Sequence, residues 1–212
     1  MPSSERRAVS FWLKDEPLIL ASSSAARRSV LEQAAIPFEI CPASIDERAI
    51  EEGLLKSGRS PDAIAAKLAK EKALTVSKQR PGRLVLGADQ LASCEGRLFA
   101  KPSGFEAAKR QLEFLSGRTH RLHSGVSIVC DGIVAFQTVE CADLRMRPFS
   151  ATFIEVYLAT ACDGVLASVG CYQLEALGAH LFESISGDHW TILGLPLLPV
   201  LEALRRQGAL LA

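Results

Sequence analysis

The chain has 212 residues, a mass of 22.8 kDa, and 24 basic side chains against 24 acidic ones. Because 48% of the residues are hydrophobic and 23% are charged, the chain can bury a sizeable core, which excludes wholesale disorder. The zero net charge disfavours a general nucleic-acid coat protein, which would carry a basic excess. The length suits one domain, or two closely packed lobes around a shared cleft.

The first predicted elements are a short buried strand, a helix and a second strand. Residues 18–21 are apolar, and the serines at 22–24 are good N-cap residues for a helix over 25–35. Pro37 ends that helix, and 38–43 follow as a strand. The turn before the helix gathers hydroxyls, backbone N–H groups and a positive helix end, which suits a phosphate.

The next segment is acidic, and we expect 44–60 to be irregular. Ser60 and Pro61 then begin a long helix, as N-cap and first helical residue, that runs to about residue 79. A buried strand at 84–86 is expected to stop at Gly87. Asp89 would therefore lie just beyond a strand end, a common place for active-site groups in open α/β sheets.

The second half of the chain alternates between helical and extended patterns. The dipeptide Asp131-Gly132 predicts a tight hairpin turn between two strands. The elements expected here are a helix at 103–115, strands at 120–130 and 133–145, a helix at 150–160, turns at 161–178, a strand at 179–185 and a helix at 196–206. This alternation predicts a mixed α/β fold.

The cysteines and histidines give no metal motif. Six cysteines without a C-x-x-C pair indicate a reducing compartment, and we expect most of them to be small core residues. His120 and His123 lie three apart on a predicted strand, so they point to opposite faces and are poor joint metal ligands. No apolar stretch is long enough for a secretory signal or a membrane span, so a cytoplasmic location without membrane contact is expected.

Four groups of residues offer chemistry for a phosphorylated ligand. They are Ser22, Ser24, Arg27 and Arg28 in the first turn; Asp46 with Glu47; the segment GADQ at 87–90 with Lys101 and Pro102; and Lys72 in the long helix. Each group alone also fits an ordinary helix cap, a solvated turn or a surface lysine. Together they offer carboxylates for a divalent metal and cations for phosphates. Hard oxygen ligands favour Mg²⁺ or Mn²⁺ over zinc.

These same residues carry a resemblance to the Maf family of nucleotide pyrophosphatases. The matching segments are LASSSAARR at 20–28, SIDE at 44–47, LAKEKA at 68–73, GADQ at 87–90, AKP at 100–102, LSGRTH at 115–120 and GDHWTILGLPL at 187–197. The matches are collinear and cover about 18–205, so the resemblance is highly specific. It implies a single Maf-like domain at 17–212, made of two lobes of a mixed twisted sheet with a central cleft, after an N-terminal extension at 1–16.

The resemblance also implies an activity. Maf-family enzymes hydrolyse a nucleoside triphosphate between the α and β phosphates with a divalent cation, here Mg²⁺ or Mn²⁺. By position, Asp89 would be the general base, and Glu47 with Asp89 would hold the metal. Four further residues would hold the triphosphate: Ser24, Arg27, Lys72 and Lys101. The implied partner is the nucleotide, with no nucleic acid or membrane, and a homodimer stays open.

The chain departs from the family pattern at three places. Ala25-Ala26 replaces the first Pro-Arg pair, Ala100 replaces a glycine, and YQLEA at 172–176 replaces Y-G-I-Q-G. Gln90 and Glu175 together resemble the branch that acts on 7-methyl-GTP, because a carboxylate can accept two hydrogens from a guanine edge. The alternative is that Glu175 pairs with Arg27 or points outward.

A second function remains open at this point. Maf proteins are also associated with septum formation, so the chain is alternatively a nucleotide-binding regulator with little turnover. Glu47, Lys72, Asp89 and Lys101 favour turnover, whereas the missing arginine at Ala26 favours the regulator. A nucleic-acid-binding module is disfavoured because the chain lacks a basic excess and a run of stacking aromatics.

Overall fold

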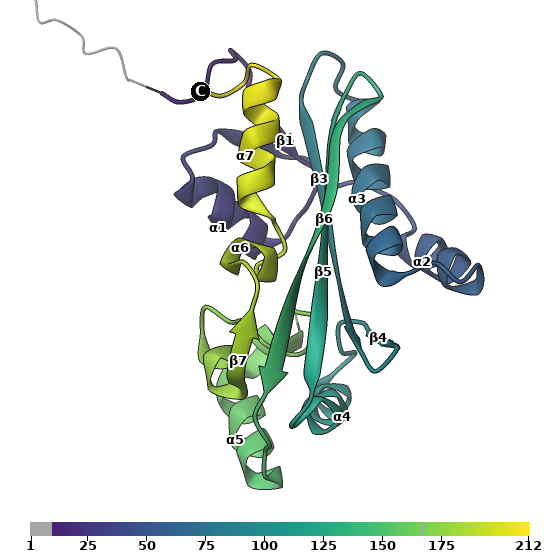
Figure 1. Ribbon diagram of the computed structural model, residues 1–212, viewed down its shortest axis with the longest axis vertical. Helices are drawn as coiled ribbons and strands as arrows, with labels where there is room; N and C mark the ends of the chain where they lie inside the picture. The colour runs from purple at the N-terminus through teal and green to yellow at the C-terminus, as the bar shows by residue number, and fades with distance from the viewer. Residues whose placement is uncertain (1–9, 167) are drawn as a thin grey trace, which may run out of the picture.

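The computed structural model describes residues 10–166 and 168–212. Its central element is a seven-stranded mixed sheet (Figure 1). The strand order is β2-β1-β3-β5-β6-β7, with β4 paired to β3 off this path. The strands are β1 (Leu18–Leu20), β2 (Phe38–Ile40), β3 (Val85–Cys94), β4 (Arg97–Phe99), β5 (Thr119–Cys130), β6 (Ile133–Met146) and β7 (Phe182–Ser186). β1 runs parallel to β2 and β3, and all other pairs are antiparallel. The predicted mixed α/β class is confirmed.

Helices cover both faces of this sheet. They are α1 (Ala25–Gln33), α2 (Glu47–Lys56), α3 (Pro61–Ser77), α4 (Phe105–Leu115), α5 (Ala151–Ala161), α6 (His189–Ile192) and α7 (Leu197–Arg206), with 3₁₀ turns η1 (Cys162–Leu166) and η2 (Leu177–Leu181). Figure 1 shows α1 and α7 on one side of the upper part of the sheet and α3 on the other. The helices predicted at 25–35, from Pro61, at 103–115, at 150–160 and at 196–206 are therefore all present.

The alternation of side chains along the strands decides which helix each residue meets. Leu20 and Leu86 pack in one cluster with residues of α1 and α7. Ile19 and Val85 pack in another cluster with residues of α3. Because successive strand residues point to opposite faces, Asp89 shares the α3 face with Val85.

Two glycines let α3 lie close against the sheet. A Cβ atom on Gly87 would meet the Ala69 carbonyl oxygen at 2.1 Å, and one on Gly125 would meet the Ala65 oxygen at 2.5 Å. Both contacts are with backbone, which cannot rotate away. Side chains at these positions are therefore incompatible with the observed distance between α3 and strands β3 and β5.

A second hydrophobic core lies at the other end of the long strands. Leu122 of β5 and Leu144 of β6 pack with Leu112 of α4 and Ile154 of α5. Figure 1 shows α4 and α5 at the lower end of the molecule, while α1, α3 and α7 lie at the upper end. The two lobes implied by the family resemblance thus share the strands β5 and β6.

The prediction that a strand ends at Gly87 is wrong. β3 continues to Cys94, and its pairing with β5 extends to Ser93 opposite Arg121. Asp89 and Gln90 thus lie within the strand rather than beyond its end. Their polar side chains interrupt the apolar pattern of a buried strand, so periodicity alone ends the strand too early.

The prediction of an irregular segment at 44–60 is also wrong, because 47–56 form α2. The Asp46 carboxylate caps this helix by accepting a hydrogen bond of 2.9 Å from the Ala49 N–H. Ile50 and Leu54, one turn apart, pack on the cluster that contains Leu68 of α3. Because acidic residues surround this narrow apolar stripe, the helical periodicity of apolar residues is weak in the sequence.

The hairpin prediction is confirmed, and one later strand is displaced. Asp131 and Gly132 both have positive φ, 49° and 75°, as a tight turn between β5 and β6 requires. The strand predicted at 179–185 is a 3₁₀ turn to Leu181 followed by β7. The short strand β4 and the four-residue helix α6 are further elements that periodicity does not predict.

The cysteines are less buried than predicted. Cys94 and Cys171 are buried, Cys41 and Cys130 are half-buried, and Cys141 is exposed; these five thiols are free. The side chain of residue 162 lies outside the described part. Cys141 lies next to buried Ala142 on β6, so strand alternation directs it outward.

The N-terminal extension at 1–16 lies partly outside the described residues. Its described end contacts the C-terminus, where Trp12 forms an isolated antiparallel bridge with Leu210. The boundary at residue 17 stays a prediction. None of the helices in the described part of the chain has the length and apolar character needed to cross a bilayer.

Candidate active site

A cleft of about 750 Å³ lies where the two lobes meet. It is lined by the β1–α1 turn, by parts of α2, α3 and β3, by the loop after β4 and by segments near 168–175 and 192–193. All the site residues predicted from the sequence line it: Ser24, Arg27, Glu47, Lys72, Asp89, Gln90, Lys101 and Glu175. The tertiary structure thus brings together residues spread over some 150 positions.

A lysine that pairs with two carboxylates lines this cleft. Lys72 Nζ lies 2.7 Å from Asp89 Oδ1 and 2.8 Å from Glu47 Oε2. Asp89 reaches Lys72 because both lie between β3 and α3, where Gly87 permits the close approach. Glu47 comes from the first turn of α2 and is half exposed, so three elements contribute to a charge cluster in which Lys72 and Asp89 are buried.

Burial dominates the electrostatics of Asp89, which is only 6% exposed. Desolvation raises the pKa of the Asp89 carboxyl above its ordinary value, although the charges of Lys72 and Arg27 oppose the shift. A raised pKa makes the ionised carboxylate a stronger base. This is the property that a proton acceptor in hydrolysis needs.

Glu51 is a site residue that the sequence analysis missed. It lines the cleft one helical turn after Glu47. Burial, followed by the negative charges of Asp89 and Glu47, raises the pKa of the Glu51 carboxyl. The i, i+4 spacing of Glu47 and Glu51 is the signal that would have found it, once 47–56 are recognised as a helix.

The three carboxylates give an oxygen-rich donor set. Among the described residues, only the Lys72 ammonium forms ion pairs with these carboxylates. After burial, the negative charges of Asp89 and Glu47 raise the pKa of the Glu51 carboxyl, and a divalent cation would relieve this repulsion. Glu47, Glu51 and Asp89 supply oxygen donors of the type that a hard cation such as Mg²⁺ or Mn²⁺ prefers.

The β1–α1 turn also lines the cleft. Ser24 caps α1, and its Oγ accepts a hydrogen bond of 3.4 Å from the Arg27 N–H. The Arg27 guanidinium is fixed by backbone: Nε donates to Gly194 O and Nη1 donates to Ala88 O, both at 2.9 Å. Burial lowers the pKa of Arg27, against the charges of Asp89 and Glu47. Arg27 is therefore a rigid cation that also joins α1 to β3.

Arg28 does not take the place of the arginine missing at Ala26. It is not among the residues that line the cleft, whereas Ala25, Ala26 and Arg27 are. Its Nε is buried and has no hydrogen-bond partner among the described residues. This agrees with the rotation of about 100° between successive helical side chains.

Gln90 and Glu175 differ in how firmly they are held. The Gln90 Nε2 donates to Ser124 Oγ at 2.9 Å and to the Thr191 and Ile192 carbonyl oxygens at 3.1 and 3.0 Å. Gln90 thus fixes α6 with its amide nitrogen. Glu175 is exposed in the cleft wall, and within the described residues it forms no ion pair with Arg27.

Comparison with known proteins identifies the relatives of the chain. A sequence model described as Maf-like protein matches residues 17–207. A nucleoside triphosphate pyrophosphatase of Nitrobacter winogradskyi is 52% identical over 204 residues, covering 95% of this chain and 99% of that protein. A 7-methyl-GTP pyrophosphatase of Rhizobium johnstonii is 49% identical over 193 residues, covering 91% and 97%. The match of the family model over nearly the whole chain, and these identities, show that the chain belongs to the Maf family.

Proposed function

We propose that the chain hydrolyses nucleoside triphosphates between the α and β phosphates, releasing a nucleoside monophosphate and pyrophosphate. The observation that carries this proposal is the buried Asp89, held with Glu47 by Lys72 in the same cleft as the start of α1. Relatives at about half identity bear the names of such pyrophosphatases. The site supplies both a proton acceptor and a phosphate-binding helix end.

In the proposed reaction, a water oxygen attacks the α-phosphorus while the bond from that phosphorus to the bridging oxygen breaks. Asp89 accepts the proton of the water, and pyrophosphate leaves with the bridging oxygen. Glu47, Glu51 and Asp89 would hold Mg²⁺ or Mn²⁺, which supplies charge neutralisation and a lowered water pKa when bound. The raised pKa of Asp89 suits it to take the proton.

Cationic groups at the cleft would bind the triphosphate chain. The N–H groups at the start of α1, with Ser24, face the cleft and suit a phosphate. Lys101 lies exposed in the loop before α4, free of ion pairs with other described residues. Its charge is therefore available to pyrophosphate as negative charge grows on the leaving group.

A panel of nucleoside triphosphates, assayed with Mg²⁺ and Mn²⁺ for pyrophosphate release, tests the proposed function. We expect pyrophosphate and monophosphate in equal amounts, no reaction with monophosphates and no activity with chelator. Release of inorganic phosphate instead would place the cleavage at another bond. Nucleotide binding without turnover under all conditions would favour the alternative regulator.

Lys101→Ala should raise KM for triphosphates and lower kcat. A cation that meets the phosphate chain acts in both the ground state and the transition state. A charged hydrogen bond of about 1.5–3 kcal/mol corresponds to a loss of roughly 10- to 150-fold in kcat/KM. Steady-state kinetics measure this loss, with Lys56→Ala as a matched control, because Lys56 is an exposed lysine at the end of α2 outside the cleft. Equal kinetics for both variants would make Lys101 a surface residue.

Glu175→Gln should shift base preference from purine towards pyrimidine, because an amide accepts one hydrogen and donates others where a carboxylate accepts twice. The side chains are nearly isosteric, so only the hydrogen-bond pattern changes. We expect a change of roughly tenfold in relative kcat/KM among 7-methyl-GTP, GTP, UTP and dTTP under one metal condition. Glu183→Gln on β7, outside the cleft, is the control. An unchanged ranking would remove the main support for 7-methyl-GTP as the substrate.

A further inference from the structure

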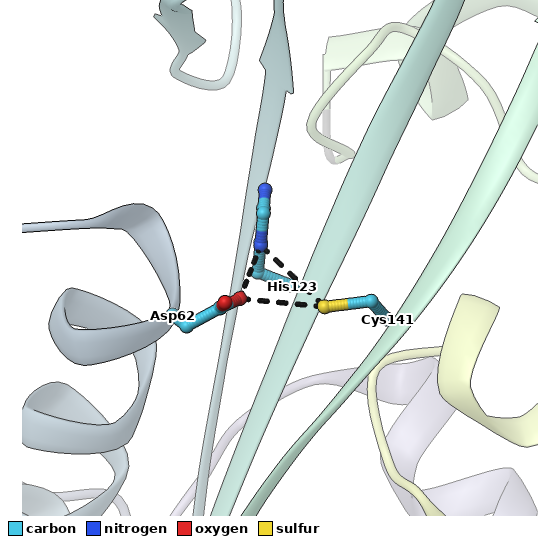
Figure 2. A group of neighbouring side chains, drawn as sticks. All are labelled: Asp62, His123 and Cys141. Carbon is cyan, nitrogen blue, oxygen red and sulfur yellow. Dashed lines mark hydrogen bonds and ion pairs between the residues drawn. The ribbon is translucent and has the colours of Figure 1, made fainter.

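A second cluster of metal-ligating side chains lies outside the cleft. Figure 2 shows Asp62, His123 and Cys141 pointing toward one another from three elements. Asp62 lies in the first turn of α3, His123 lies on β5, and Cys141 is directly opposite His123 on β6. None of the three lines the cleft, so the cluster has no part in the proposed hydrolysis.

The three ligand atoms have nearly the spacing of a tetrahedral metal site. Cys141 Sγ lies 3.3 Å from Asp62 Oδ1 and 3.6 Å from His123 Nδ1, and Nδ1 lies 2.5 Å from Oδ1. With zinc bonds of about 2.0–2.3 Å, neighbouring ligand atoms lie about 3.3–3.6 Å apart. Two of the three distances already fit, and the third has to lengthen by about 0.9 Å. Asp62 is exposed on the first turn of α3, so its side chain has room to make this small movement.

The other nitrogen of the histidine is already oriented. His123 Nε2 lies 2.8 Å from Ser93 Oγ on β3, while the ring itself is buried. A hydrogen bond from Nε2–H to Ser93 would leave Nδ1 with its lone pair towards Asp62 and Cys141. Histidines that bind metals characteristically donate their second N–H in this way, which fixes the ring and the tautomer.

The charges around the cluster permit a cation. Arg121, on the same strand as His123, is held by Asp143 in a two-point ion pair with both distances 2.7 Å. Its positive charge is thereby neutralised. The Asp62 carboxylate lies 3.3 Å from Cys141 Sγ, and a metal ion bound between them can displace the thiol proton.

We propose that Asp62, His123 and Cys141 bind one Zn²⁺ ion, with a solvent molecule as the fourth ligand. One carboxylate oxygen, one imidazole nitrogen and one thiolate form a donor set that suits zinc and is too soft for Mg²⁺. The exposure of Asp62 and Cys141 leaves the fourth position open to water. On binding, a zinc–sulfur bond forms and the thiol proton passes to solvent. The ion ties the start of α3, the helix that carries Lys72, to the β5–β6 hairpin.

Cobalt substitution with a pair of cysteine variants tests this site on the full chain. With Mg²⁺ at saturation to occupy the cleft carboxylates, we expect one equivalent of Co²⁺ to produce a thiolate-to-cobalt charge-transfer band, and Zn²⁺ to remove it. Cys141→Ser should abolish the band and weaken zinc binding at least tenfold. Cys130→Ser is the matched control, because Cys130 is another free thiol beside a carboxylate, that of Asp131, at the far end of β5.

A second variant and a second measurement keep the test independent of folding effects. Asp62→Asn removes a charged ligand from an exposed position and should weaken zinc binding at least tenfold without loss of the fold. Zn²⁺ should raise Tm of the unsubstituted chain and of Cys130→Ser, and leave Tm of Cys141→Ser unchanged. A cobalt band that survives in Cys141→Ser, or its absence from the unsubstituted chain, overturns the proposal.

Discussion

Asp89→Asn is expected to lower kcat by about 10²–10⁴-fold, because an amide cannot accept the proton of the attacking water. The substitution changes little else in the core. Lys72 keeps its ion pair of 2.8 Å with Glu47, so the ammonium is not left without a partner, and we expect the variant to fold. Steady-state kinetics at saturating metal and an unfolding curve are the two measurements. A loss of less than tenfold would remove Asp89 from the catalytic role.

The pH dependence of the rate distinguishes a role of Asp89 as proton acceptor from a purely structural role. Asp89 has to be ionised to act as a base, and burial raises its pKa above the ordinary carboxyl value. The rate is therefore expected to fall as pH decreases through that raised pKa, giving an acid limb displaced towards neutral pH. Asp89→Asn should remove this limb from the residual activity. A limb that persists unchanged in the variant would assign it to another group, such as Glu51, whose pKa is also raised.

Gly87→Ala is expected to destabilise the fold by about 3 kcal/mol or more, because the added Cβ would lie 2.1 Å from the Ala69 carbonyl oxygen. Neither the Gly87 backbone nor the Ala69 backbone can move to relieve this contact without separating α3 from β3. For a chain of this length the loss corresponds to a decrease in Tm of roughly 6–12 °C. Because α3 carries Lys72, kcat/KM should fall as well. Thermal unfolding and steady-state kinetics measure the two effects.

Gly53→Ala is the matched control for this substitution. Gly53 lies in the interior of the exposed helix α2, and a Cβ there would meet nothing within 4 Å. Alanine in a helix is favoured over glycine by roughly 0.5–1 kcal/mol, so Tm should stay the same or rise slightly. A similar loss of Tm for both variants would mean that the close approach of α3 to Gly87 does not contribute to stability.

The sequence by itself determined those features that depend on neighbouring residues. The strand, serine turn and helix at the start of the chain follow from a local apolar run and a local N-cap, which Ser24 forms. The hairpin follows from Asp131-Gly132, whose positive φ values few other dipeptides adopt without strain. The helix after Ser60 follows from its cap and from Pro61 at the first position.

The family resemblance named the residues of the cleft, but their arrangement depended on the tertiary structure. Asp89 was expected beyond a strand end and lies within β3, since pairing with β5 maintains the strand through polar residues. Glu51 was missed because the helix that contains it is stabilised by packing of Ile50 and Leu54 on α3, far along the chain. Local periodicity contains no information on such contacts.

The cluster around His123 depended entirely on the tertiary structure. Spacing correctly indicated that His120 and His123 are poor joint ligands, and the structure pairs them with different partners, Tyr172 and Asp62. Asp62 and Cys141 are separated from His123 by 61 and 18 positions. Only the register of β5 with β6 and the packing of α3 on the sheet bring these side chains within hydrogen-bonding distance of one another. Such long-range contacts follow from how helices and strands pack, which no short sequence pattern specifies.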